Sequence, residues 1–539
     1  MKLIPYLIIT LAPLSLFSAS LNIGLLQEWD ILHPISYQTA ASESLMHLLQ
    51  RQMVYRDASG QIWPEIAQEI PSFKNKKAKQ IVINGQKKIQ AQWALKKEAV
   101  WSDGTPITCQ DWDFGWRVGM NDKVSKNEKS LFSKIESIKW VDAKICNVIY
   151  ADSSWSFDRD LPPFLPFHKE RLIYEKWGHE KPQAYEQNSN YVKAPQTEGL
   201  YSGPYQVQEI KLGQYIILKK NKNFWGEKPT IDQITIKFVT DSNLIKSYLL
   251  SGQINMVAPV GLPFDVALSV HKDLNDKFKV HFLNSFLYQG LFLNLENPLL
   301  QEQALRQALE LSIDKDAITK NFFDAQVVPA NSILWNEKKD LLKIKGDVAK
   351  ANYLLDQAGW KKTTTGREKN GKKLILTFKT SSGLKVLENI QVYICDRFLK
   401  IGVQCNIKNE PARVFLGESV PHGDFDIGLF GNATLPDTSL KGLFSSAEIP
   451  TAQNAWAGGN IMRLKNNEVD QLLVQFDQES NASKREKLLQ NLNNLIANNK
   501  WLIPLYHRKE TAIVPNGFKG FENDIRSTAL VYPERWRLN

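Results

Sequence analysis

The sequence is poor in histidine and cysteine, the residues that most often bind metals and serve as nucleophiles or bases. Its 539 residues include only 8 His and 4 Cys. The histidines are dispersed, no two of them have the helical spacing of a metal-binding pair, and no cysteines have CxxC spacing. These absences argue against an ordinary metal site, and we predict neither a resident metal nor a cofactor.

The short motifs of several enzyme classes are also missing. There is no GxSxG, HExxH or P-loop motif. Two segments, Ser312 to Lys315 and Ser382 to Lys385, fit the SxxK pattern of acyl-serine enzymes, but a pattern this short is expected by chance in so long a chain. We therefore predict that the protein is not an enzyme and keep a periplasmic serine hydrolase as an alternative.

Beyond residue 20, no segment approaches the ~20 apolar residues of a membrane span. The first twenty residues have the layout of a secretory signal: Lys2 is the positive start, Leu3 to Phe17 the apolar run, and Ser18 to Ser20 the cleavage site. Pro5 and Pro13 argue against the alternative, an uncleaved anchor helix. No cysteine stands at the cleavage site to carry a lipid anchor, so we predict export to the periplasm of a bacterium with two membranes.

Positive charge is in modest excess and is scattered along the chain. Lys and Arg number 67 against 57 Asp and Glu, which gives a net charge of +10. The densest basic runs, Lys74 to Lys79 and Lys369 to Lys373, contain no aromatic residues, which nucleic-acid grooves use to stack bases. We therefore interpret these runs as solvated faces or hairpins and predict no nucleic-acid partner.

The four cysteines permit disulfides if the chain is exported. They are Cys109, Cys146, Cys395 and Cys405, and four cysteines allow three pairings. Two local bridges, Cys109 to Cys146 and Cys395 to Cys405, are one interpretation. Buried free thiols are the other, and the sequence leaves both open.

One stretch, Ala91 to Arg117, organises the first part of the chain. It starts with the alternation of a strand, and Ser102 to Pro106 must turn because Gly frees the backbone and Pro lacks a ladder donor. Thr108 is then expected to cap a helix, with an acidic residue, Asp111, three positions later. Two large aromatic residues are expected in the core, Trp101 and Trp112.

Other segments have clear local signals. The pairs Asn84-Gly85 and Asn370-Gly371 stand between alternating runs and predict tight hairpins. The longer elements that we expect are a surface loop over Gln183 to Glu198, strands at Tyr288 to Leu293 and Trp501 to Tyr506, and one long helix over Val469 to Asn498.

The stretch from Trp93 to Asp111 resembles the signature of the family 5 extracellular solute-binding proteins, the peptide- and oligopeptide-binding components of ABC importers. Further matches follow in the family's order: Gly203 to Tyr205, Asn221 to Trp225, Pro229 to Ile236 and Leu305 to Lys315. The resemblance runs from about residue 21 to about residue 510. One departure is His33, which stands where the family's Leu-Asp-Pro turn has Asp.

The resemblance implies an α/β, bilobal periplasmic binding protein fold of the cluster C type, with a small extra domain inserted in the N-terminal lobe. At about 150 residues per domain, the length agrees with about three domains. We expect a signal peptide over 1–20, lobe I from 21–60, 195–285 and 506–539, the inserted domain over 61–194, and lobe II over 286–505. The crossings near 285 and 505 would form the hinge.

The resemblance also points to a loop of lobe II, Gly428 to Thr438, as part of the ligand cleft. Peptide-binding relatives often place an Asp there, which pairs with the peptide's α-amino group. Aligning Pro436 and Asp437 with the family's Pro-Asp puts Thr434 at that place. Because Thr cannot neutralise an ammonium, either another acid such as Glu43 or Asp437 takes the role, or the ligand has no free amine there.

The candidate ligand-binding residues come from an early loop, this later loop and two tryptophan-containing segments. They are Tyr37, Ser42, Glu43, Trp335, Phe430, Asn432, Thr434, Asp437, Trp456 and Asn460. We predict a monomeric periplasmic protein that closes on a short peptide or peptide-like solute, such as a cell-wall peptide, and delivers it to the permease subunits of an ABC transporter. The alternatives are a metal chelate or haem as ligand, and an interaction or chaperone-like protein that keeps the fold without transport.

Overall fold

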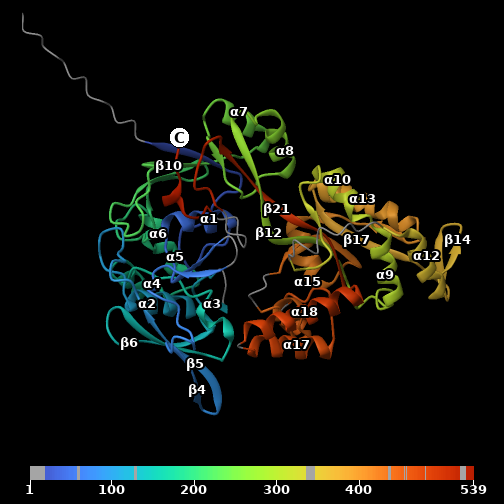
Figure 1. Cartoon of the computed structure of the whole chain (residues 1–539), viewed down its shortest axis with the longest axis horizontal. Helices are drawn as coiled ribbons and strands as arrows, with labels where there is room; N and C mark the ends of the chain where they lie inside the picture. Colours follow the sequence, from blue (N-terminus) through green and yellow to red (C-terminus); the bar gives the residue numbers. More distant parts are fainter. Residues whose placement is uncertain are drawn as a thin grey trace, which may run out of the picture.

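A twelve-stranded mixed sheet runs through most of the molecule in the computed structural model, and helices cover both of its faces (Figure 1). The model describes residues 19–57, 61–126, 130–334, 346–434, 439–454, 456, 458–479, 481–522 and 530–538. The main path of the sheet is β18-β17-β20-β12-β21-β11-β1-β10-β9-β8, with β13 attached to β21 and β19 to β17. The fold is therefore of the mixed α/β class that the sequence predicts.

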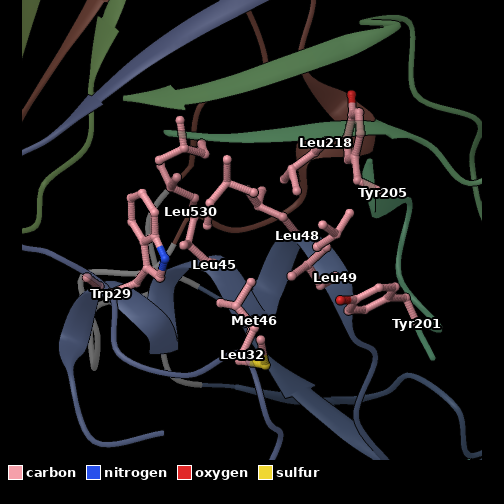
Figure 2. Close-up of a cluster of buried hydrophobic side chains, with 14 of the residues drawn as sticks. Trp29, Leu32, Leu45, Met46, Leu48, Leu49, Tyr201, Tyr205, Leu218 and Leu530 are labelled. Atoms are coloured by element: carbon pink, nitrogen blue, oxygen red, sulfur yellow. The ribbon is translucent and has the colours of Figure 1, made fainter. Parts of the chain in front are cut away.

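One half of this sheet, with its helices, forms what we call lobe I. Its strands are β1 (Ser20–Leu25), β8 (Tyr205–Lys211), β9 (Tyr215–Lys220), β10 (Gln233–Phe238) and β11 (Met256–Val257). β1 lies parallel to β10 and β11, and its alternate residues Leu21, Ile23 and Leu25 are fully buried. This alternation, together with helix α1 (Ala40–Leu49), builds the core that Figure 2 shows around Trp29, Leu45 and Leu48.

Helices α4 (Phe167–Trp177), α5 (Ala184–Asn188) and α6 (Asn190–Lys193) pack onto the same core. A buried polar chain ties them to the segment before α1. The backbone N–H of Ile35 donates to Nδ1 of His33 at 3.3 Å, Nε2 of His33 lies 3.4 Å from the Tyr185 hydroxyl, and that hydroxyl donates to the Glu170 carboxylate at 2.9 Å. The expectation of a surface loop over residues 183–198 was wrong, because these tertiary contacts fold much of it into two short helices.

The segment around Trp93 to Asp111 folds as predicted, in a smaller unit that we call the small domain. Its sheet has the order β4 (Ala78–Ile83), β5 (Gln86–Ala94), β7 (Ile145–Tyr150) and β6 (Ile135–Trp140). Helix α2 (Cys109–Met120) begins after Thr108, whose N–H and hydroxyl both donate to the Asp111 carboxylate, at 2.7 and 2.9 Å. The capping prediction is confirmed, and Trp101 and Trp112 are fully buried as expected.

The other half of the long sheet belongs to what we call lobe II. Its strands are β17 (Ile375–Ser382), β18 (Gln404–Ile407) and β20 (Ile427–Ala433). The helices that pack on this part are α9 (Gln303–Ser312), α10 (Lys315–Phe323), α12 (Val348–Gln357), α13 (Lys385–Leu399), α17 (Asn467–Gln478) and α18 (Ala482–Asn499). The single helix expected over Val469 to Asn498 is in fact α17 and α18, since Asn481 ends the run and caps α18 through the N–H of Lys484.

Shorter elements connect these parts. In lobe I and the small domain they are β2 (Val54–Arg56), β3 (Ile62–Pro64), α3 (Ser130–Ser133), η1 (Trp155–Asp158), η2 (Ser242–Leu244), α7 (Ile245–Leu250), α8 (Phe264–Asp273) and η6 (Pro533–Arg535). In lobe II they are β13 (Val328–Pro329), β14 (Lys361–Thr363), β15 (Gly366–Lys369), β16 (Lys372–Lys373), β19 (Glu410–Pro411), α14 (Ala412–Val414), η3 (Phe415–Ser419), α15 (Val420–His422), α16 (Lys441–Phe444), η4 (Ser446–Glu448) and η5 (Ala452–Asn454).

Both predicted hairpins are present. Asn84-Gly85 joins β4 to β5 and Asn370-Gly371 joins β15 to β16, and all four residues have the positive φ that such turns require. The cysteines form the two local bridges, Cys109–Cys146 and Cys395–Cys405, which decides between the two interpretations of the sequence. The numerical domain boundaries given above stay a prediction.

Candidate ligand cleft

Two long antiparallel strands join the lobes. β12 (Phe278–Leu293) and β21 (Leu502–Pro515) pair from Phe278 opposite Pro515 to Phe292 opposite Leu502. At one end Val280 and Ile513 pack in a lobe I cluster, and at the other Leu291 and Ile503 lie in the lobe II core. The connection between the lobes is thus a continuous two-stranded ribbon, at the place where the sequence predicts the hinge.

The ribbon is irregular between the lobes. Asn284 pairs with Lys509 and Tyr288 with His507, so three residues of β12 face the single residue Arg508 of β21. The Ser285 hydroxyl holds this bulge by accepting the N–H of Leu287 at 3.0 Å. A bulge leaves backbone groups outside the ladder and bends the strand, and such a point can absorb the dihedral changes of a hinge.

The end of β20 lies against β12 at this bulge, where we place the floor of the predicted cleft. Asn432 pairs with Tyr288, and Gly431 pairs with Gln289. The Gln289 side chain is only 3% exposed, and its amide Nε2 has no hydrogen-bond partner among the described residues. We call Tyr288, Gln289, Gly431, Asn432 and Thr434 the floor cluster. Tyr288 and Asn432 lie on one face of the sheet, and Gln289 and Gly431 lie on the other. Because a buried amide without a partner is costly, this Nε2 is the kind of group that a bound solute satisfies.

Thr434, the residue aligned with the amine-anchoring Asp of relatives, is 1% exposed and lies next to Tyr288. Its backbone N–H donates to the carbonyl of Phe286 at 3.3 Å. Burial raises the pKa of Tyr288, and the Thr434 hydroxyl beside it partly offsets that rise. Asn432 is half-buried, and its Oδ1 accepts the N–H of Ala433 at 2.7 Å. Two predicted residues are therefore brought together in the floor cluster.

A cation lies close to Gly431 in the floor cluster. Arg508, opposite the bulge, is 43% exposed and pairs with Glu510 at 3.2 Å. Its Nη1 lies 3.7 Å from the position that a Cβ atom on Gly431 would take. A guanidinium at that place can receive a carboxylate from a solute, and Glu510 balances its charge.

Phe430 and Asn460 have structural contacts in lobe II. The Phe430 ring stacks on Phe292, with centroids 4.1 Å apart and planes 9° apart. Asn460 is fully buried, and its amide donates to the carbonyls of Phe444, Ser445 and Leu464. These contacts account for both residue types without a solute, and a role in binding stays a prediction.

The early-loop candidates lie in lobe I. Tyr37 packs against the core cluster of lobe I, and Glu43 lies in the first turn of α1. The buried Ser42 hydroxyl donates to the Asp30 carboxylate at 2.5 Å and accepts the N–H of Asp30 at 3.0 Å. Ser42 thus fastens the start of α1. A direct role of these three residues in binding stays a prediction.

Three further candidates come from lobe II. Trp335 and Asp437 lie outside the described residues. Trp456 is 37% exposed, has the left-handed φ of 60° that is uncommon for a bulky residue, and its ring centroid lies 4.2 Å from that of His422. Its neighbour in the structure is therefore His422, and not the floor cluster.

Sequence reasoning missed Gln289, Arg508 and Trp155. Gln289 and Arg508 stand in or beside segments recognised as strands, but their place on the floor depends on which strands pair. Trp155, on η1 of the small domain, contacts α17 and α18 of lobe II. Its one local signal is its spacing from Phe157, since two large aromatic residues in a short helical turn must face different surroundings.

The described residues contain neither a metal-binding cluster of side chains nor a membrane-spanning helix. Among them, no three His, Cys, Asp or Glu side chains gather closely enough to hold a metal ion. Over the same part of the chain, no helix combines the length and apolar content needed to cross a membrane.

Comparison with known proteins agrees with this architecture. Residues 87–450, more than half of the chain, match the model of the bacterial extracellular solute-binding proteins, family 5 Middle. The oligopeptide-binding protein AppA of Bacillus subtilis (strain 168) is 27% identical over 461 residues, which cover 82% of this chain and 80% of AppA.

Solved structures show the same fold. AppA from Bacillus subtilis in complex with a nonapeptide has a TM-score of 0.73 at 22% identity, covering 96% of this chain and 99% of that one. NikZ from Campylobacter jejuni in complex with Ni(L-His) has a TM-score of 0.72 at 21% identity, with the same coverage. Their fold is the bilobal one with a cleft between the lobes. The chain belongs to the family 5 bacterial extracellular solute-binding proteins.

Proposed function

We propose that this protein captures a short peptide or peptide-like solute in the cleft between its lobes and delivers it to an ABC importer. The observation that carries this proposal is the floor cluster at the hinge bulge, where the buried Gln289 amide lacks a partner within the described residues. The match with AppA, an oligopeptide-binding protein, supports a peptide as the class of solute.

Closure about the hinge would supply the binding free energy. A solute between two lobes contacts both of them only when the cleft is shut, so it stabilises the closed state by the contacts that the open state lacks. The floor cluster lies at the hinge itself, where the distance between the lobes changes least. A solute can therefore bind the floor cluster first and gain contacts with the rest of both lobes when they close.

The charges at the floor favour a particular end of the solute. In the alignment with relatives, Thr434 takes the place of an acid that pairs with the peptide's amino group, whereas Arg508 presents a cation on the Gln289 face of the floor cluster. A carboxylate, from a peptide C-terminus or an acidic side chain, suits this end of the cleft better than a free ammonium does. An amide group of the peptide would pair with Gln289, on the face of the sheet that Arg508 also approaches.

The partners and the compartment are parts of the same proposal. The first twenty residues would act as a cleaved export signal, and the monomer would work in the periplasm without a lipid anchor. The loaded, closed form would then dock on permease subunits in the inner membrane. The chain would bind and release its solute without changing it chemically.

A metal chelate is the second candidate, and Arg508 is the observation that favours it. An organic chelator presents carboxylates on its outer surface, and a guanidinium receives these as readily as it receives a peptide carboxylate. NikZ, with the same fold, was solved in complex with Ni(L-His).

Mass spectrometry of the solute released from the purified periplasmic protein by denaturation separates the two candidates. A reproducible set of peptides, returned in unmodified form, supports the proposal. A stoichiometric metal with an organic ligand, measured together with elemental analysis, would replace it with the chelate.

A further inference from the structure

Trp155 of the small domain is buried by residues of lobe II. It opens the short helix η1 (Trp155–Asp158), and its side chain is 7% exposed. Two positions later, Phe157 points the other way, into the core of the small domain, where it contacts Tyr150 with ring centroids 5.4 Å apart. Phe157 therefore anchors η1 to its own domain, while Trp155 belongs to a hydrophobic cluster made otherwise of lobe II residues.

Trp155 makes one edge-to-face ring contact and two cation–π contacts. Its ring meets the ring of Phe476 on α17 edge to face, with centroids 5.9 Å apart and planes at 89°. The guanidinium carbon of Arg485 on α18 lies 3.8 Å from the Trp155 ring centroid, and that of Arg159 lies 4.8 Å from it. Edge-to-face aromatic pairs and cation–π contacts of this kind are among the stronger contacts that a single tryptophan can make.

The charges around this tryptophan are partly shielded from water. Burial lowers the pKa of Arg485, and the charge of Arg159 lowers it further, while Asp158 and Glu479 act in the opposite direction. Arg159 is in turn paired with Asp158 at 2.7 Å. A partly buried guanidinium over an aromatic ring interacts more strongly than a fully exposed one, so losing the contact has a cost.

The Trp155 contact lies far from the strands about which the lobes would open. In Figure 1 the strands β12 and β21 lie near the middle of the view between the lobes, whereas α17 and α18 lie at the bottom beside the small domain. The small domain and lobe II are thus joined at two places, directly at the Trp155 contact and through lobe I at the ribbon. Opening about the ribbon moves the lobes apart most at the points farthest from it, and must withdraw Trp155 from Arg485 and Phe476.

We propose that Trp155, with Arg485 and Phe476, is an interlobe clamp that holds the cleft shut and sets how long a solute stays bound. The small domain then has a role of its own, because it carries the tryptophan that lobe II receives. The effect on solute release rests on the proposed function, but the clamp itself can be measured in the protein without any solute.

The test is a distance measurement between the small domain and lobe II. All four cysteines are in disulfides, so cysteines introduced by Val141→Cys and Val474→Cys can be labelled selectively with a fluorescent donor and acceptor. Both valines are exposed, on the small domain and on α17 respectively. In solute-free protein, single-molecule energy transfer reports the fraction of closed molecules.

Trp155→Ala in this labelled protein should reduce the ratio of closed to open molecules by about tenfold or more, the size of effect expected from losing a buried aromatic and a cation–π contact. Trp155→Phe should give an intermediate ratio, because the ring remains. Arg485→Gln should also open the cleft, whereas Trp63→Ala, which removes an exposed tryptophan on β3, should leave the ratio unchanged.

Far-UV circular dichroism and thermal unfolding of each variant establish that it is folded. The clamp is overturned if folded Trp155→Ala and Arg485→Gln both keep the distance distribution of the unmutated labelled protein. This result would leave the proposed binding function untouched. If Trp155→Ala opens the cleft but no peptide is found in the purified unmutated protein, the proposed function is overturned and the clamp stands.

Discussion

The Oε1 atom of Gln289 lies 3.1 Å from the position that a Cβ atom on Gly431 would take. The two residues are direct partners in the pairing of β12 with β20. Any side chain larger than hydrogen at position 431 would press on the Gln289 amide, so the glycine leaves the amide room on the floor of the cleft. Gly431 therefore helps to hold the unpartnered Nε2 of Gln289 in place. Replacing Gln289 is the most direct test of the floor cluster.

Gln289→Leu should weaken solute binding at least tenfold while leaving the free energy of unfolding unchanged or raising it by about 1 kcal/mol, because a buried polar group without a partner is lost. Calorimetry with a synthetic copy of the co-purified peptide measures the first effect, and urea unfolding of the solute-free protein measures the second.

Gln206→Leu is the matched control for this prediction. Gln206 lies on β8 of lobe I, is also buried, and its Oε1 has no hydrogen-bond partner in the part of the chain that the structure describes. It should not change the affinity. Equal losses of affinity in the two variants would show that the effect is indirect.

Thr434→Asp should destabilise the solute-free protein at pH 7 by about 1–3 kcal/mol, because it buries a carboxylate beside Tyr288. If Thr434 occupies the amine-anchoring place, a peptide with a free α-amino group should bind this variant more tightly than it binds the unmutated protein. Calorimetry with that peptide and its N-acetylated form measures the difference. Thr434→Asn supplies the uncharged control, and equal affinities of Thr434→Asp for both peptides would contradict the alignment.

The protein should lose stability as the pH falls below about 6.5, in part because of His33. Burial lowers the pKa of His33 from 6.5 to about 3. Between these values the unfolded chain binds a proton that the folded protein excludes, so the free energy of unfolding falls by about 1.4 kcal/mol for each pH unit that the pH is lowered.

His33→Asn should remove the contribution of His33, about 1.4 kcal/mol for each pH unit, and leave that of His47, whose pKa burial also lowers, to about 4. Urea midpoints at pH 7, 6, 5 and 4 would show the change. His179→Asn, at an exposed histidine, is the control and should keep the slope. An unchanged slope in His33→Asn would mean that His33 is not the group that titrates.

The two disulfides should contribute different amounts to the free energy of unfolding. Cys109 and Cys146 are 37 residues apart and Cys395 and Cys405 only 10. In the chain-entropy account, the longer loop contributes about 4 kcal/mol and the shorter about 3 kcal/mol. Paired Cys→Ala replacements, compared by urea unfolding, should therefore destabilise the protein more at 109 and 146. A larger loss at 395 and 405 would mean that packing, and not loop entropy, decides the order.

Local sequence signals predicted local structure well. Thr108 and Asp111 identified the start of α2, and two Asn-Gly pairs identified hairpins, because each feature depends on a few neighbouring residues. The break between α17 and α18 also had a local signal, the capping residue Asn481, which the apolar spacing on both sides concealed.

The ribbon was harder to predict than either lobe. The strands expected at Tyr288 to Leu293 and Trp501 to Tyr506 are the lobe II ends of β12 and β21, which continue for many residues into lobe I. The continuation of β21 begins with His507, Arg508, Lys509 and Glu510, and such polar residues form a strand only because β12 pairs with them. Tertiary pairing decides where the lobes connect, and the resemblance placed the predicted hinge in these strands where periodicity did not.

The same limit applies to the site. The resemblance placed Asn432 and Thr434 on a cleft loop, and the structure brings both to the floor cluster. Gln289 could not be found from its neighbours, since a single amide in a strand becomes a candidate only when the strand beside it and its missing partner are known.

The central claim is that two lobes close on a solute that leaves unchanged, and small-angle X-ray scattering combined with mass spectrometry tests it most directly. The protein would be freed of solute by partial unfolding and refolding, then mixed with a synthetic copy of the co-purified peptide. The account predicts a smaller radius of gyration on addition of the peptide and recovery of the intact peptide. An unchanged scattering curve, with the peptide cleaved over time, would contradict it.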